Sequence, residues 1–323
     1  MKKILLISTI AVFAVITAKA QKPELASAIV HYKFSHLRDT TMKDKPYTEN
    51  MILFLGQTSS AYKSYDRKMQ DALMRKQVAD QLAEQKGQGN IQIKVSNSNP
   101  ATTTEYYSFP LQNRFARKER LITPYLIEEP MPVINWKISA DTASFGGLHC
   151  QKATGHFKGR DYTAWFCPDL PLHSGPWKLN GLPGLILEAY DKNKEVVFKF
   201  DYMEKVTPSD KPADGGGGSS GGGAVIASSG TTVKMFGMDD PNVDPNLIAV
   251  PVDAVKTTEK EFKNLQDAMK KDPQAFAQSA MAGAGMNMKP AGATGDRGSG
   301  QSMKIQTSPG PVINNPLELP EKK

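Results

Sequence analysis

The chain has 323 residues, of which 23% are charged, and a formal net charge of +7 at pH 7. Its basic residues are scattered and lack the interleaved aromatic residues of a nucleic-acid surface, so we exclude nucleic acid as a partner. The sequence also has no His-Glu-x-x-His motif, no nucleophile elbow between a strand and a helix and no phosphate-binding glycine loop. These absences disfavour a catalytic function.

Residues 1–20 predict a secretory signal peptide. Lys2 and Lys3 form its positive start, an apolar run follows, and Ala18-Lys19-Ala20 is a small-x-small cleavage site before Gln21. The apolar run is shorter than the roughly 20 residues that span a bilayer, and no later stretch is more apolar. We therefore expect an exported protein, periplasmic or extracellular, that does not span the membrane. Removal of the leader takes away three lysines and leaves a net charge of +4.

Residues 21–206 predict a β-rich domain. Short alternating or apolar segments follow one another with short connections, which favours antiparallel pairing. We expect a mainly β, α+β fold: a curled antiparallel sheet, either an open barrel or a sandwich. The predicted strands are 27–36, 49–57, 91–95, 105–109, 113–120, 124–127, 133–138, a hairpin over 148–166, 185–190 and 195–206. One insertion, 66–85, predicts a helix that covers the sheet, with Met69, Leu73, Met74, Val78 and Leu82 on its apolar face.

Cys150 and Cys167 are the only cysteines, and an even count in an exported chain favours a disulfide. If Lys158 and Gly159 form a two-residue turn, the two cysteines face each other across the hairpin. The alternative is a pair of reduced, buried thiols. A catalytic thiol is disfavoured, because the adjacent His149 points to the opposite face of the strand.

A glycine–proline segment follows the hairpin and predicts a tight turn that leads into a buried strand. Its glycines can adopt positive φ or allow close backbone approach, and its prolines fix φ. This interpretation is structural and assigns no reactive group to the segment. The motif residues are Gly175, Pro176, Trp177, Gly181, Leu182, Pro183, Gly184, Leu185 and Ile186.

The remainder of the chain changes in composition. Residues 207–256 predict a glycine-rich flexible insertion and a return segment, and 282–311 are rich in Gly, Ala, Ser and Pro and predict disorder. Between them, 257–281 predicts a helical segment. Thr258 and Glu261 form a capping box there, and Asp272-Pro273 begins a second helix. Residues 312–323 predict a tail that docks back on the body.

Several motifs together resemble the GLPGLI family, exported bacterial proteins named for the hexapeptide found here at 181–186. The other matching motifs are Tyr32-x-Phe34-x-His36, Ile134-x-Trp136-x-Ile138, Cys150-Gln151-Lys152-Ala153, Gly159-Arg160-x-Tyr162 and Asn315-Pro316-Leu317-Glu318-Leu319. The resemblance implies an envelope-associated protein of a Bacteroidetes-type bacterium. It implies no catalytic or ligand residues.

Two classes of function follow from these patterns. The first is a non-catalytic binding or assembly module for an envelope protein or a small apolar or peptide ligand, with Tyr106 and Tyr107 as exposed aromatic residues. The second is Cu(I) handling, because thioethers select that soft ion. An enzyme with an unrecognised site is a further alternative, and no cofactor is indicated. The candidate metal ligands are Met235, Met238, Met281, Met286 and Met288.

Overall fold

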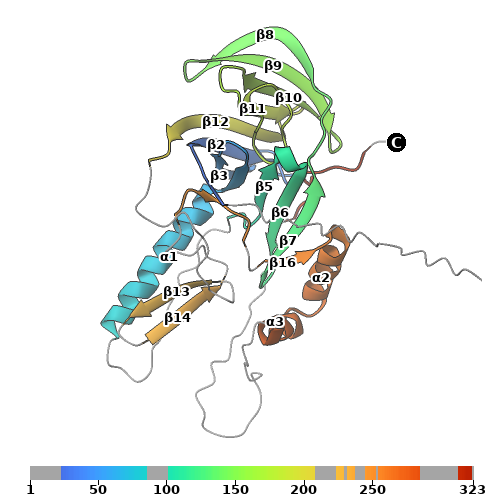
Figure 1. Ribbon diagram of the computed structural model, residues 1–323. Helices are drawn as coiled ribbons and strands as arrows, with labels where there is room; N and C mark the ends of the chain where they lie inside the picture. Colours follow the sequence, from blue (N-terminus) through green and yellow to red (C-terminus); the bar gives the residue numbers. More distant parts are fainter. Residues whose placement is uncertain are drawn as a thin grey trace, which may run out of the picture.

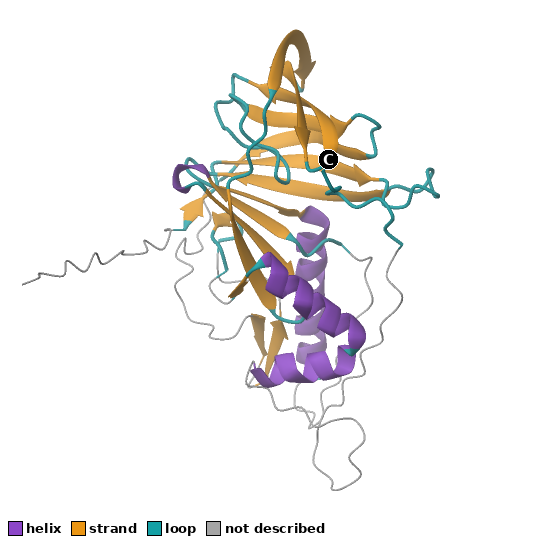
Figure 2. Ribbon diagram, turned by 90° about the vertical axis from the view of Figure 1, so that its right-hand side faces the viewer, coloured by secondary structure: helices purple, strands orange, loops and turns teal. Residues whose placement is uncertain are grey.

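The computed structural model describes residues 23–85, 101–207, 223–228, 231–236, 244–251, 254–283 and 312–321. It shows a large, strongly twisted β-sheet with three α-helices beside its lower half (Figures 1 and 2). The predicted leader, the predicted strand 91–95 and nearly all of 282–311 lie outside the described residues. The mainly β fold class is confirmed.

The main sheet has twelve strands in the order β16-β7-β6-β5-β4-β3-β2-β12-β11-β10-β9-β8. All neighbours pair antiparallel except β16 and β7, which are parallel. Its outermost described strands, β16 and β8, do not pair with each other, so the sheet is open. The strands are β2 (Ala28–His36), β3 (Tyr47–Leu55), β4 (Ser60–Ser64), β5 (Glu105–Phe109), β6 (Arg114–Arg120), β7 (Pro124–Pro130), β8 (Lys137–Phe145), β9 (Leu148–Phe157), β10 (Arg160–Cys167), β11 (Leu185–Asp191), β12 (Val196–Lys205) and β16 (Val255–Thr257). A short 3-10 turn, η1 (Pro110–Gln112), joins β5 to β6.

Four further strands lie outside this sheet. β1 (Glu24–Leu25) pairs with β15 (Leu247–Ile248), and β13 (Gly223–Ser228) forms a hairpin with β14 (Thr231–Phe236) beside α1 (Figure 1). The return segment therefore contains strands that its glycine-rich composition did not predict.

The sheet buries apolar side chains on both faces. Along β2, Val30, Tyr32 and Phe34 point into the larger core, where the curled second half of the sheet covers them. Ile29 on the same strand belongs to a second cluster, on the opposite face, with Phe54 of β3. This alternation follows from the period of two along a strand, and it fixes the register of the central strands.

The predicted helix over 66–85 is α1 (Tyr65–Glu84), and Ser64 caps its first turn by accepting a hydrogen bond from the Arg67 amide. Asp71, Val78 and Leu82 are its buried residues. Met69 and Leu73 are exposed, so their assignment to the covering face was wrong. Both lie away from the side of the helix that contacts the sheet, because residues 71, 78 and 82 define one face at the helical period.

Two helices follow β16. α2 (Glu259–Lys271) begins at the predicted capping box, where Thr258 and Glu261 bond reciprocally, and Phe262 packs against Tyr125 of β7. α3 (Pro273–Gly283) follows directly, and the Asp272 carboxylate accepts a hydrogen bond from the Ala275 amide. Local capping chemistry thus specified both helix starts.

The β9–β10 hairpin has the predicted turn. Lys158 and Gly159 both have positive φ, and Phe157 lies opposite Arg160. In contrast, the predicted strand at 133–138 is wrong over most of its length, since β8 begins at Lys137. The apolar residues Ile134 and Trp136 instead pack against the large core. Packing at Gly155, where a Cβ would lie 2.9 Å from the Trp136 ring, holds this segment in place.

Candidate functional site

The C-terminal segment 312–321 lies against the sheet and is held there by buried polar groups. We call the surface that receives it the tail site, defined by His36, Leu37, Lys158, Arg160, Lys178 and Glu195. These residues come from the end of β2, the β9–β10 turn, the glycine–proline segment and the start of β12. Distant parts of the chain therefore converge on one short peptide.

Main-chain hydrogen bonds align the tail. The amides of Asn314 and Asn315 donate to the Arg38 carbonyl oxygen at 3.1 and 3.0 Å, and the Leu319 amide donates to the Lys158 carbonyl oxygen at 3.0 Å. Gly159 lies directly beneath the tail, and a Cβ there would come within 2.7 Å of the Leu319 oxygen. The turn therefore needs glycine both for its positive φ and for the close approach of the tail.

Arg160 is the central residue of the tail site. Its guanidinium, only 2% exposed, donates to the Leu317 oxygen at 3.0 Å, to the Asn315 Oδ1 at 2.7 Å and to the Pro316 oxygen at 2.8 Å. Asp191 neutralises it through a 2.7 Å ion pair. A buried arginine is tolerated only when its donors are matched, and the tail supplies three of the acceptors.

Asn315 completes this network. Its side-chain amide donates to the Leu37 oxygen at 2.8 Å and to Glu195 at 3.0 Å, while its own carbonyl oxygen lies 2.9 Å from His36 Nε2. Burial, assisted by the positive charge of Arg160, lowers the pKa of His36 to about 4. His36 is therefore neutral near pH 7, with the Nε2 proton donated to the tail.

The tail is also held by charge. Glu318 forms ion pairs with Lys178 at 2.9 Å and with Lys158 at 3.2 Å. Burial opposes ionisation of Glu318, but the two lysines outweigh it and lower its pKa. Lys178 is buried and lies within the glycine–proline segment. The sequence motif and the tail are therefore in direct contact.

The glycine–proline segment forms a tight turn in which close backbone contacts and positive φ values require its glycines. Gly184 has φ +155°, and a Cβ there would lie 2.2 Å from the Cys167 oxygen. Gly181 also has positive φ, and Gly175 approaches the Leu179 oxygen too closely for a side chain. Leu182, Leu185 and Ile186 are fully buried, as are the neighbouring positions of β11. The Leu185 and Ile186 amides donate to Leu170 and Ser174, so the turn is tied to the chain before it.

Trp177 has φ +55°, which is unusual for a large residue and was not predicted from the sequence. Its ring is buried and stacks on Phe198, with an interplanar angle of 11°. Beside it is a cavity of about 10 Å³, lined partly by polar groups that include Ser60, Ser174 and the buried Tyr62 hydroxyl. This volume holds about one water molecule, so in this conformation the cavity does not admit an organic ligand.

Cys150 and Cys167 are buried, free thiols, so the predicted disulfide is not formed in this structure. The register that the prediction relied on is present, because Phe166 lies opposite Gln151 and the cysteines come next on each strand. Burial, together with the neighbouring Cys167, raises the pKa of Cys150 to about 12. The alternative, two reduced and buried thiols, describes this structure.

The other predicted site residues do not converge. Met235 lies on β14 and Met281 on α3, two separate elements, while Met238, Met286 and Met288 lie outside the described residues. Within the described ranges no cluster of three His, Cys, Asp or Glu residues is placed to hold a metal. Tyr107 is buried and Tyr106 packs against the large core, so their assignment as exposed aromatics was wrong.

Sequence reasoning did not identify the Arg160–Asp191–Asn315 network. Arg160 and Asn315 were visible as parts of the family motifs, but nothing local marked them as partners. In the described part of the chain, no helix combines the length and apolar character needed to cross a bilayer.

Comparison with known proteins adds a short family match. Residues 156–188 match a family described as "Protein of unknown function (Porph_ging)". The matched region runs from the β9–β10 turn through the glycine–proline segment into β11. It thus contains Arg160 and Lys178 of the tail site. No curated protein matches the chain.

Two solved structures are similar at low level, titled "Structure of PNGF-II in P21 space group" and "Structure of PNGF-II in C2 space group". Each is 13% identical with a TM-score of 0.39 and covers 57% of this chain. The chain spans only 29% and 28% of the lengths of those proteins. A likeness at this level supports no functional conclusion.

Proposed function

We propose that the protein is an exported, non-catalytic binding or assembly module of the cell envelope, of the GLPGLI type, and that the tail site recognises a short peptide segment. The observation that carries this proposal is the engagement of Asn315 by the buried Arg160 at 2.7 Å. A site that already holds a short, bent segment of its own chain has the chemistry to hold an equivalent segment of a partner.

The tail site recognises two kinds of group on the peptide, backbone oxygens and two polar side chains. Two backbone oxygens, of Pro316 and Leu317, accept from Arg160 regardless of side-chain identity. The Asn315 side chain and the Glu318 carboxylate supply the sequence-dependent contacts. The site therefore favours an Asn-Pro-x-Glu segment in the bent conformation of the tail, whether it comes from the same chain or from an envelope partner.

The covalent link does not force the tail to bind its own body. Residues 284–311 separate the tail from α3, and at about 3.3 Å per residue such a length can reach roughly 90 Å. The chain's own tail and a partner segment then compete for the tail site, and the own tail has the advantage of a high effective concentration. A partner segment can displace it when the own tail binds weakly.

A peptide-binding experiment tests this function. A fluorescent peptide with the sequence of residues 312–321 is titrated into the full-length mature chain and into its Asn315→Ala variant. We expect tighter binding to the variant, because its own tail competes less well for the site. The control peptide carries alanine at the position of Asn315. The proposal fails if the variant does not bind the peptide or binds both peptides equally.

Export and the envelope partner are tested separately. Amino-terminal sequencing of the protein from fractionated cells should give Gln21 as the first residue. Crosslinking in intact cells, with a photoreactive residue in place of Lys158 of the tail site, should trap the same partner repeatedly when Asn315 is also replaced by alanine. Recovery of the uncleaved protein from the cytoplasm alone would contradict export.

A further inference from the structure

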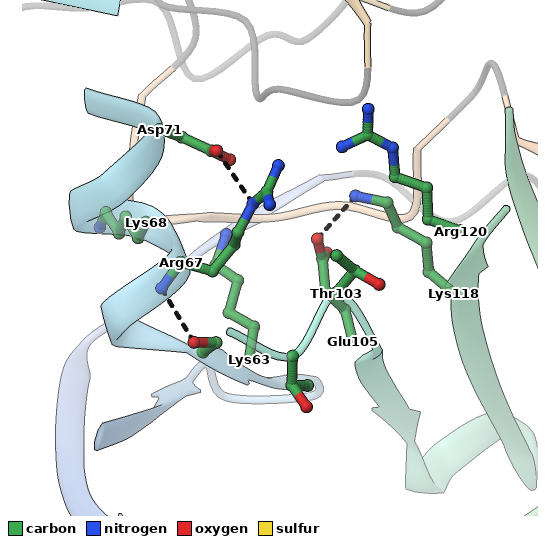
Figure 3. A pocket seen from close by; sticks show the side chains of 10 residues that line it. Lys63, Arg67, Lys68, Asp71, Thr103, Glu105, Lys118 and Arg120 are labelled. Carbon is green, nitrogen blue, oxygen red and sulfur yellow. Dashed lines mark hydrogen bonds and ion pairs between the residues drawn. The ribbon is translucent and has the colours of Figure 1, made fainter. Parts of the chain in front are cut away.

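A second site lies away from the tail site, where α1 begins. It is a pocket of about 30 Å³, open to solvent, between the first two turns of α1, the segment before β5 and the end of β6 (Figure 3). Its small volume suits the terminal group of a ligand whose remainder stays in solvent.

The lining of this pocket is strongly cationic. Its lining contains two acidic residues, Asp71 and Glu105, and five basic ones: Lys63, Arg67, Lys68, Lys118 and Arg120. Arg67 pairs with Asp71 at 2.9 Å, and Lys118 with Glu105 at 2.6 Å. Both carboxylates are therefore already engaged by lysine or arginine, and the lining as a whole carries an excess of three positive charges.

Three of these cations converge from opposite walls. In Figure 3 the side-chain ends of Arg67, from α1, and of Lys118 and Arg120, from β6, turn toward one another. Burial, and then the charge of Arg67, lower the pKa of Arg120, while the Asp71 carboxylate opposes that shift. Repulsion between like charges in a partly buried site is unfavourable, and a bound anion would offset it by attracting each of the cations.

We propose that this pocket binds a tetrahedral oxyanion, a phosphate or sulfate group, either free or as an ester at the end of a larger ligand. The planar guanidinium forks of Arg67 and Arg120 can each engage two oxygens of such a group from opposite sides. Lys118 adds a point charge, and Thr103 also lines the pocket. This site is independent of the peptide-binding function proposed above.

Calorimetric titration of the full-length mature chain tests the proposal. Inorganic phosphate and glycerol 3-phosphate are titrated near neutral pH at low ionic strength, in a buffer whose only anion is chloride. We expect saturable binding that weakens at least tenfold, about 1.4 kcal/mol, in both Arg120→Gln and Arg67→Gln. Tighter binding of the ester would identify a larger ligand, and equal binding would identify the free anion.

Matched variants separate this site from general charge. Arg114→Gln removes the same charge from the other end of β6, where Arg114 pairs with Glu128, and should leave the affinity unchanged. Arg120→Lys keeps the charge without the fork and serves if Arg120→Gln fails to fold. The proposal is overturned if no saturable binding occurs, if Arg114→Gln weakens it equally, or if acetate binds as tightly as phosphate.

Discussion

The side chains of Arg160 and Asn315, 155 positions apart in the sequence, are joined by a buried hydrogen bond of 2.7 Å. Arg160 begins β10 at the hairpin turn, and Asn315 belongs to the tail that crosses it. Among the contacts that hold the tail, this one joins two buried side chains, and no strand pairing assists it. We therefore expect it to contribute strongly to how firmly the tail is bound.

Replacing Asn315 by alanine should destabilise the fold. The change removes an acceptor from the buried Arg160 and leaves the partly buried Leu37 oxygen without its donor, which costs about 1–3 kcal/mol. Urea unfolding should show a lower midpoint with an unchanged slope. Asn314→Ala, at a neighbouring exposed position, is the control and should cost less. Equal losses in the two variants would contradict the central position of Asn315.

Arg160→Met should be more damaging, because it leaves Asp191 buried without its counter-charge. The expected cost is about 3–5 kcal/mol of unfolding free energy. Adding Asp191→Asn to that variant removes the stranded charge and should recover part of the loss. A double variant that is no more stable than Arg160→Met would show that packing, and not charge, dominates at this position.

The stability of the protein should fall as the pH falls through the range where His36 titrates in the unfolded state. His36 has a pKa near 4 in the fold and 6.5 as its reference value. Between these values the unfolded chain binds a proton that the folded protein does not, so stability is full above pH 6.5 and is lost toward pH 4. Allowing for partial solvent screening, we expect a loss of about 2 kcal/mol.

The matched variant for this pH effect is His36→Gln, which keeps a donor for the Asn315 oxygen and does not titrate. Unfolding free energies measured across the same pH range should decline less steeply in the variant. Parallel pH profiles in the two proteins would mean that His36 is not the titrating group.

Gly184→Ala should severely destabilise the glycine–proline turn. A Cβ at this position would lie 2.2 Å from the Cys167 oxygen, so the backbone of both segments must move, at about 3 kcal/mol or more. Gly147→Ala is the control, since Gly147 also has positive φ but nothing lies within 4 Å of its added Cβ. Only conformational strain, about 1 kcal/mol, is expected there. Thermal unfolding of both variants measures the difference.

The two thiols should be unreactive in the folded protein. A pKa near 12 keeps Cys150 protonated, and both cysteines are buried. A thiol reagent at mildly alkaline pH should therefore label the native chain slowly and label both cysteines rapidly in urea. If chain purified without reductant fails to react even in urea, the thiols are bridged in the isolated protein.

The parts of the fold that the sequence predicted are those in which neighbouring residues carry the information. Alternation specified β2 and β12, the capping box specified the start of α2, and the Lys158–Gly159 pair specified the hairpin turn. The strand at 133–138 failed because its apolar side chains pack onto the core from an irregular segment. Periodicity alone does not distinguish these two uses of apolar residues.

The binding sites were not predictable for a different reason. Asn315 and Arg160 are 155 positions apart and are brought together by the folded sheet, and Arg67 lies near Arg120 because α1 lies beside the end of β6. Neither pair has a local sequence signature, because nothing in the neighbouring sequence distinguishes these polar residues from ordinary surface residues. Partners of this kind follow from three-dimensional packing alone.

The central pairing of the sheet has a kinetic consequence. β2 lies between β3 and β12, and Phe34 of β2 pairs with Phe198 of β12. The middle of the sheet therefore cannot be completed until a strand on the order of 160 residues later in the chain has been synthesised. Completion of the main sheet is thereby delayed until most of the polypeptide exists, although β2, β3 and β4 pair with their neighbours in the sequence.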